Sequence, residues 1–131
     1  MSVHSFEDLV VYKKARELRK EVYKLIKKLP REERFELVSQ MKRAAISVTN
    51  NIAEGFGRFH YQENIQFCRH TRGSINELID DLNICLDENY GEENNVRELK
   101  VRAYELIKML NSYIAGIKRS KDNDPMTLMT Q

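Results

Sequence analysis

Residues 40–58 read Gln-Met-Lys-Arg-Ala-Ala-Ile-Ser-Val-Thr-Asn-Asn-Ile-Ala-Glu-Gly-Phe-Gly-Arg, and at helical spacing they carry two different faces. With Leu37 just before the stretch, the apolar face comprises Leu37, Met41, Ala44, Ala45, Val48 and Ile52. The polar face comprises Gln40, Arg43, Ser47, Asn51 and Glu54. Solvated helix faces are usually filled with Lys and Glu, whereas Ser, Asn and Gln beside alanines favour close packing with internal hydrogen bonds. We therefore expect a helix whose polar face also meets protein, ended by Gly55 and Gly57 in the left-handed conformation.

The composition favours a helical protein with one core. The chain has 131 residues, of which 41% are hydrophobic and 32% charged, with five Gly, two Pro and no Trp. This length suffices for one core, and the scarcity of turn residues argues against a β-sandwich or barrel. No apolar run reaches the roughly 18 residues needed to cross a bilayer, and residues 1–7 lack the order of a secretory signal. We expect a single cytoplasmic domain without membrane contact.

Further apolar stripes at three- and four-residue steps predict the other helices. The stripe of the fourth helix comprises Val96, Leu99, Ala103, Leu106, Leu110, Tyr113 and Ile117. The expected helices span about residues 5–29, 31–54, 61–88 and 93–118. Ser5 is suited to cap the first, Pro30 can start the second, and residues 89–91 form a turn before the fourth. Residues 119–131 lose the pattern and are expected to be a disordered tail. Because short connections make sequential helices antiparallel neighbours, the sequence predicts an all-α, up-down-up-down four-helix bundle.

The third expected helix also has a polar side. Its members are Arg69, Arg72, Ser74, Glu77 and Asp81. Gly73 costs about 1 kcal/mol relative to alanine in mid-helix, so we expect another backbone to pass close to it. We interpret the polar residues of both helices as helix-to-helix hydrogen bonds or a subunit contact, with a ligand site as the alternative. The predicted network comprises Gln40, Arg43, Ser47, Asn51, Glu54, Ser74 and Glu77.

Five cations share one side of the first expected helix, within an arc of roughly 80° at about 100° per residue. This basic ridge consists of Lys13, Arg16, Lys20, Lys24 and Lys27. A common cationic face suits contacts with RNA or DNA phosphates, and the near absence of interleaved aromatics predicts weak sequence specificity. A solvated face is the alternative. Residues 73–99, with eight acidic and one basic residue, could also attract the ridge within one chain or between copies.

No catalytic, metal or cofactor site is predicted. A ferritin-like site needs Glu-x-x-His on facing helices, whereas His4, His60 and His70 are scattered. The segment 55–58 follows a helix and is too short for a dinucleotide fingerprint. Cys68 and Cys85 would be roughly 25 Å apart on one helix at about 1.5 Å per residue, too far to pair, so we expect buried free thiols.

Four motifs carry a resemblance to a known family. They are Phe6-Glu-Asp-Leu9, Gln40-Met-Lys-Arg-Ala-Ala-Ile-Ser-Val48, Asn51-Ile-Ala-Glu-Gly55 and Gly73-Ser-Ile-Asn-Glu-Leu78. Over residues 5–117 the chain resembles the bacterial four-helix bundle family named for proteins encoded in intervening sequences of 23S ribosomal RNA genes. The resemblance implies a closed ring of bundles, a homopentamer. It also implies kinship with the accessory proteins of diversity-generating retroelements, which bind nucleic acid and a reverse transcriptase.

We therefore expect a non-catalytic, oligomeric helical bundle that binds RNA or DNA through the basic ridge. The alternative is a protein–protein interaction scaffold without nucleic-acid binding, suggested by the acidic segment 73–99 and the small-residue stripes. Neither function requires a cofactor.

Overall fold

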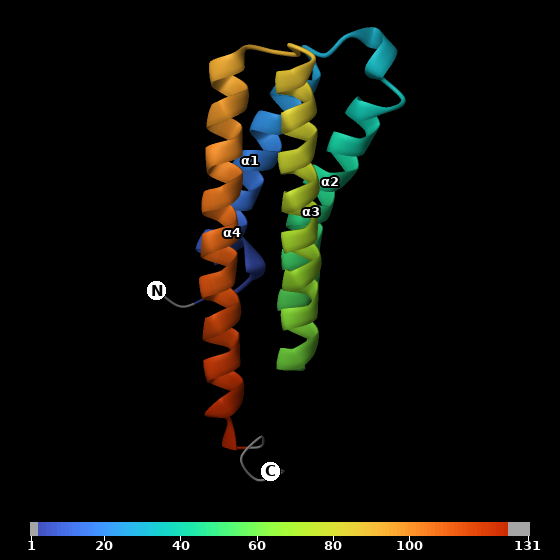
Figure 1. The fold of residues 1–131 in the computed structure, drawn as a ribbon. Coiled ribbons are helices and arrows are strands. Elements are labelled where there is room, and N and C mark those ends of the chain that lie inside the picture. The colour runs from blue at the N-terminus through green and yellow to red at the C-terminus, as the bar shows by residue number, and fades with distance from the viewer. Residues whose placement is uncertain (1–2, 126–131) are drawn as a thin grey trace.

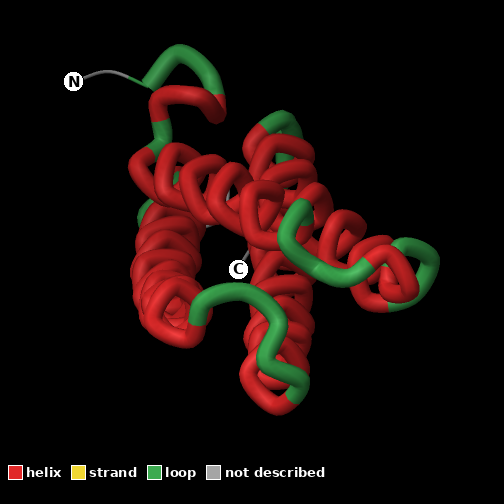
Figure 2. The backbone as a smooth tube through the Cα atoms, turned by 90° about the horizontal axis from the view of Figure 1, so that it is seen from above, coloured by secondary structure: helices red, strands yellow, loops and turns green. Residues whose placement is uncertain are grey.

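The computed structural model describes residues 3–125, which form four α-helices and two short 3₁₀ turns (Figure 1). The turns are η1 (Phe6–Asp8) and η2 (Arg31–Glu33), and the helices are α1 (Val10–Ile26), α2 (Leu37–Phe56), α3 (Tyr61–Asp87) and α4 (Glu93–Asp122). Over residues 3–125 Figure 2 shows helices and loops and no strand. The predicted fold class, an all-α four-helix bundle, is confirmed.

Each helix packs against two others. The contacting pairs are α1 with α2, α2 with α3, α3 with α4, and α4 with α1. In Figure 1, α3 and α4 lie side by side in front of α1 and α2. Gln62 of α3 contacts Lys121 of α4, whereas Arg72 contacts Asn111, so these two helices run antiparallel.

The apolar stripes of the four helices meet in one core. Fully burying a Val, Leu, Ile or Met side chain stabilises the fold by about 1.5–3 kcal/mol, so this core supplies the main driving force. None of the helices described over residues 3–125 is long and apolar enough to cross a membrane. The largest fully buried side chains include Val22, Leu25, Met41, Ile52, Ile75, Leu82, Leu99 and Leu110.

The first helix begins later than the sequence predicts, because Ser5 caps η1 and not α1. Its Oγ accepts a hydrogen bond from the Glu7 amide, and its own amide donates to Asp8 Oδ2. Backbone amides of His4 and Ser5 that donate to Asp8 lower the pKa of its carboxyl group. Leu9 is then extended, and α1 starts at Val10.

The second helix also differs from its expected span of 31–54. Residues 31–33 form η2, and α2 starts only at Leu37. The carboxylate of Glu33 accepts a hydrogen bond of 2.8 Å from the Tyr90 hydroxyl, which ties η2 to the turn between α3 and α4. A contact between residues so far apart in the sequence cannot be read from local spacing.

The fourth helix continues four residues beyond its expected end at 118. Residues 119–122 are helical, so the predicted disordered tail is wrong for them, and its last six residues, 126–131, lie outside the described residues. Two contacts to the start of α3 hold this end. Lys121 Nζ donates to Gln62 Oε1 at 3.2 Å, and the Tyr61 hydroxyl donates to Asp124 Oδ2 at 3.0 Å.

The glycines act differently from the prediction. Gly57 follows the end of α2 with φ −75°, so neither it nor Gly55 uses the left-handed conformation. A Cβ on Gly55 would lie 2.8 Å from Asn64 Oδ1 and 2.9 Å from Phe67 Cβ, whereas a Cβ on Gly73 would meet no atom within 4 Å. The close approach predicted at Gly73 therefore occurs at Gly55, where α3 packs against α2.

Candidate nucleic-acid interface and interhelical groove

The basic ridge lies on the surface of α1. All five of its cations are exposed, with Lys27 at the C-terminal cap of the helix. Lys24 Nζ lies 3.0 Å from Glu21 Oε1, and within residues 3–125 it is the one ridge cation in an ion pair. Neighbouring carboxylates therefore offset little of the ridge's charge, which leaves it suited to phosphate groups.

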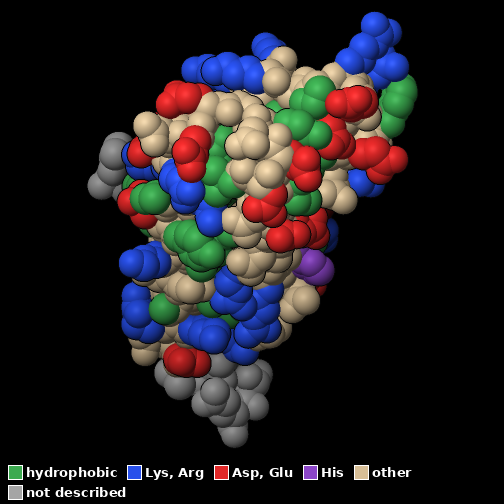
Figure 3. All heavy atoms as spheres, turned by 45° about the horizontal axis from the view of Figure 1, so that its top comes forward, with side chains coloured by type: hydrophobic (Ala, Val, Ile, Leu, Met, Phe, Trp, Pro, Cys, Tyr) green, Lys and Arg blue, Asp and Glu red, His purple; other side chains and the backbone are tan. Residues whose placement is uncertain are grey.

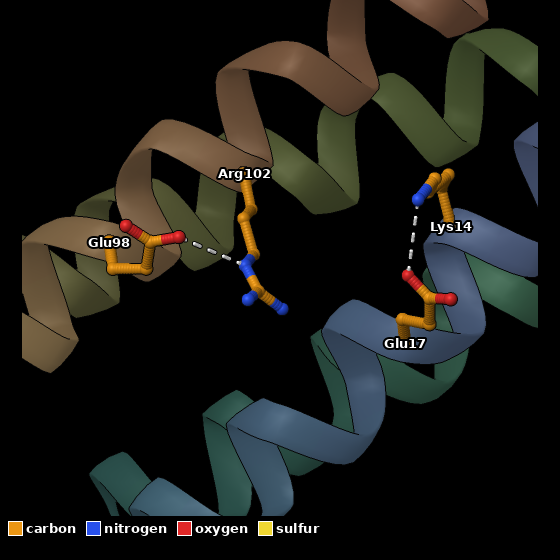
Figure 4. A network of polar contacts seen from close by, with 4 residues as sticks. All are labelled: Lys14, Glu17, Glu98 and Arg102. Carbon is orange, nitrogen blue, oxygen red and sulfur yellow. Dashed lines mark hydrogen bonds and ion pairs between the residues drawn. The ribbon is translucent and has the colours of Figure 1, made fainter.

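The adjacent surface between α1 and α4 is electrically balanced. Lys14 Nζ lies 3.5 Å from Glu17 Oε2 on α1, and Arg102 Nε lies 3.4 Å from Glu98 Oε1 on α4. Figure 4 shows that each of these two pairs stays within its own helix. Exposed pairs of this kind contribute only about 0.3–0.5 kcal/mol. Both cations already have an anionic neighbour, which distinguishes this surface from the ridge.

A second basic surface follows the junction of α3 and α4. Two hydrogen bonds place its cations there: Arg72 Nη1 donates to Asn111 Oδ1 at 2.9 Å, and Lys121 Nζ donates to Gln62. Arg69 and Lys118 each precede one of these cations by three residues, which keeps them on the same helix faces. Figure 3 shows Lys and Arg gathered low on this side of the molecule. This α3–α4 strip consists of Arg69, Arg72, Lys118 and Lys121.

Sequence reasoning missed the α3–α4 strip. It assigned Arg69 and Arg72 to the polar side of the third helix and ended the fourth helix before Lys121. A signal was present, since cations spaced by three residues occur on both helices. That spacing becomes a shared surface only when the antiparallel register of α3 and α4 is known.

The turn between α2 and α3 adds an exposed aromatic ring to this end of the bundle. Phe59 is 93% exposed, and its ring packs edge-on against His60 at 5.3 Å between centroids. The guanidinium of the preceding Arg58 lies 5.0 Å from the centre of the Phe67 ring. The contact between Gln62 and Lys121 brings this turn close to the α3–α4 strip. An exposed ring beside cations is a suitable platform for stacking an unpaired base.

The predicted polar network divides into two groups. Ser47, Asn51 and Ser74 are buried or half-buried between α2 and α3, where Ser74 Oγ donates to Ser47 Oγ and Asn51 Nδ2 also donates to Ser47, each at 2.8 Å. The other four members are exposed in the described chain, so their expected burial against protein does not occur within one subunit. These four are Gln40, Arg43, Glu54 and Glu77.

An open groove of about 530 Å³ runs beside this network, between α2 and α3. On the right side of Figure 3, where α2 and α3 lie, acidic side chains gather on the surface. The buried carboxylate in this groove is Asp81, which is 3% exposed. Burial, followed by the charges of Asp80 and Glu77, raises the pKa of Asp81 to about 6. The groove is lined by Gln40, Arg43, Ala44, Ser47, Ser74, Glu77, Asp80 and Asp81.

Comparison with protein families identifies the chain. The family model described as 23S rRNA-intervening sequence protein matches residues 7–112. The chain belongs to this family. The match includes α1, α2, α3, α4 as far as residue 112, and the whole basic ridge. Of the α3–α4 strip it includes Arg69 and Arg72, whereas Lys118 and Lys121 lie beyond it.

A solved structure from Bacteroides thetaiotaomicron is similar to this member of the 23S rRNA-intervening sequence family. It is described as a protein of unknown function from the S23 ribosomal protein family. The two chains are 24% identical with a TM-score of 0.74, over 80% of this chain and 98% of the other. This likeness supports the four-helix fold alone. Comparison with curated proteins finds no match.

The remaining reactive groups of this family member are placed in the core. Cys68 and Cys85 are buried and unpaired, as predicted, and burial raises the pKa of each thiol to about 11, which makes both poor nucleophiles. Within residues 3–125 no three His, Cys, Asp or Glu side chains are grouped as a metal site.

Proposed function

We propose that this protein is a non-catalytic, oligomeric helical bundle that binds the backbone of RNA or DNA in the cytoplasm. The observation that carries this proposal is the ridge on α1, where five exposed cations share one face and a carboxylate pairs with one of them. Phosphate binding depends on such a row, because each neutralised phosphate releases condensed counterions.

The α3–α4 strip and Phe59 extend the proposal. The strip adds four cations, and the exposed ring of Phe59 provides a stacking platform that the ridge lacks. Contacts to phosphates position a nucleic acid without reading its sequence. We therefore expect weak sequence specificity, with unpaired bases preferred near the α2–α3 turn.

Charge reversal tests the ridge. Replacement of Lys20, Lys24 and Lys27 by Glu should weaken binding to a structured RNA and to duplex DNA at least roughly tenfold and flatten its salt dependence, because fewer counterions are released. Fluorescence anisotropy of the purified, nuclease-treated protein at low and near-physiological salt measures both effects. Unchanged binding would remove the ridge from the interface.

Two further variants complete this experiment. Replacement of Arg69, Arg72 and Lys118 by Glu tests the α3–α4 strip in the same assay. The matched control reverses Lys42, Arg97 and Arg102, three exposed cations outside both surfaces, with the same change in net charge. If the control weakens binding as much as the other two variants, the effect comes from net charge and neither surface is a defined interface.

The second candidate function is a protein–protein interaction scaffold without nucleic-acid binding, and the acidic groove between α2 and α3 is the observation that favours it. Recovery of one stoichiometric protein partner after nuclease treatment, with no affinity for RNA or DNA at low salt, would support it. Kinship with the accessory proteins of diversity-generating retroelements would make a reverse transcriptase a partner to test in either case.

A further inference from the structure

We propose that the groove between α2 and α3 is a binding site for a guanidinium group, held by the carboxylates of Asp81, Asp80 and Glu77. The site lies away from the basic ridge and the α3–α4 strip, and the inference does not rest on nucleic-acid binding. It follows from the burial of Asp81, the acidic lining of the groove and the hydrogen-bond acceptors beside it.

Asp81 is the first observation. It is 3% exposed and lines the groove, and no described residue donates a hydrogen bond to its Oδ2 atom. A buried carboxylate without a partner is costly, whereas one paired with a hydrogen-bonded cation is tolerated. Among residues 3–125 no cation lies within 4.0 Å of the Asp81 carboxylate, which leaves it as an acceptor for an incoming positive charge.

The second observation is the arrangement of charge around Asp81. Glu77 lies one helical turn before it and Asp80 directly before it, both exposed at the groove. Their charges add to burial in raising the pKa of Asp81. A bound cation would relieve this repulsion between like charges.

The hydrogen-bonding groups of the groove favour a guanidinium over a metal ion. A guanidinium carries five donors and no acceptor in a planar fork, which matches the carboxylates and the side-chain oxygen of Gln40 in the same lining. A metal is disfavoured because, among residues 3–125, no three His, Cys, Asp or Glu side chains are placed so that they could hold one metal ion. A volume of about 530 Å³ is within the range of small-ligand pockets.

Arg43 is the basic residue in the groove lining. Among the described residues it forms no ion pair within 4.0 Å, although it lines the same groove from α2. Arg43 therefore competes with an incoming cation by charge repulsion or by folding into the site. Its removal should strengthen binding, whereas removal of Asp81 should weaken it.

Calorimetric titration of the full chain tests the site, with agmatine as the probe. We expect saturable binding at one site per chain. Asp81→Asn should weaken it at least roughly tenfold, because the buried charge is lost. Arg43→Gln should strengthen binding, and Glu98→Gln, which removes one exposed carboxylate on α4, should leave it unchanged. Absence of saturable binding, or equal affinity for wild type and Asp81→Asn, would overturn the proposal.

Two further titrations, with Mg²⁺ and with an arginine peptide, determine the chemical class and the source of the ligand. Mg²⁺ in place of agmatine should not bind the groove, and preferential binding of Mg²⁺ would replace the guanidinium with a metal and overturn the proposal. A short acetylated arginine peptide distinguishes a side chain of a polypeptide from a free small molecule. Tighter binding of the peptide than of agmatine identifies a polypeptide source, and the reverse order identifies a free cation.

Discussion

On α3, the buried carboxyl group of Asp81 has its pKa raised from 3.8 to about 6, first by burial and then by Asp80 and Glu77. A carboxyl whose folded-state pKa lies above its unfolded value favours folding only when protonated. Its contribution is fully present below about pH 4 and is lost as pH rises through 6. At neutral pH the ionised group therefore destabilises the ligand-free bundle.

We predict that Asp81→Asn raises the free energy of unfolding at pH 7 by about 1–2 kcal/mol. One pKa unit corresponds to about 1.4 kcal/mol, and solvent in the open groove reduces the full effect. Urea denaturation at pH 7 and pH 5 measures it, and the advantage of the variant should shrink at pH 5, where wild-type Asp81 becomes protonated. A variant less stable than wild type at pH 7 would mean that Asp81 has a cationic partner in the ligand-free protein.

At the scale of the helices, the packing of α2 against α3 depends on the small size of Gly55. A Cβ there would lie 2.9 Å from Phe67 Cβ, so Gly55→Ala forces the two helices to shift. We predict that this substitution lowers the free energy of unfolding by about 1–3 kcal/mol, despite the better helix propensity of alanine.

Gly73→Ala is the matched control. Gly73 is also helical, but open space surrounds the position of its missing Cβ, so alanine should raise the free energy of unfolding by up to about 1 kcal/mol. Thermal or urea denaturation of both variants compares them directly. If Gly73→Ala destabilised the protein, a second copy or a partner would have to pack at that point.

The helices show what local sequence can and cannot predict. Spacing predicted the apolar stripes well, because burial follows the helical period. One difference occurs on α4, where Ile114 is buried and the predicted Tyr113 is only half-buried. The period of 3.6 residues drifts from a strict heptad, which moves the inward face by one position. The late start of α2 and the extension of α4 were missed, and contacts to residues distant in the sequence, Tyr90 and Gln62, occur at both places. Local spacing contains no record of such contacts.

The candidate sites, too, were predictable from the sequence only where all of their residues belong to one helix. The ridge was predictable because all five of its cations belong to one helix. The α3–α4 strip and the groove each combine residues of two helices, so their composition depends on the register between those helices. Asp81 belonged to a polar side in the sequence, yet nothing in its spacing indicated that it would be 3% exposed.

Across the whole molecule, the charged and apolar surfaces are arranged in a way that suits several copies. The acidic groove lies between α2 and α3, whereas the basic surfaces lie on α1 and at the junction of α3 and α4, so they occupy separate regions of one subunit. Val101 and Tyr104 lie on the outer surface of α4, each 53% exposed. Apolar side chains exposed to this extent are candidates for contacts between subunits. These features support the oligomeric assembly that we include in the proposed function. The family resemblance implies that this assembly is a homopentamer.

We predict that light scattering coupled to size exclusion gives several times the chain mass of 15.5 kDa. Tyr104→Glu should reduce the mass, because it places a charge in an apolar contact, whereas Lys27→Ala should leave it unchanged.

An assembly would repeat the basic ridge and the α3–α4 strip around one particle, and linked sites raise the effective concentration of each weak contact. Loss of assembly should therefore weaken nucleic-acid binding even when every cation is retained. A wild-type monomer would contradict the assembly, and a monomeric variant with unchanged affinity would show that a single subunit suffices.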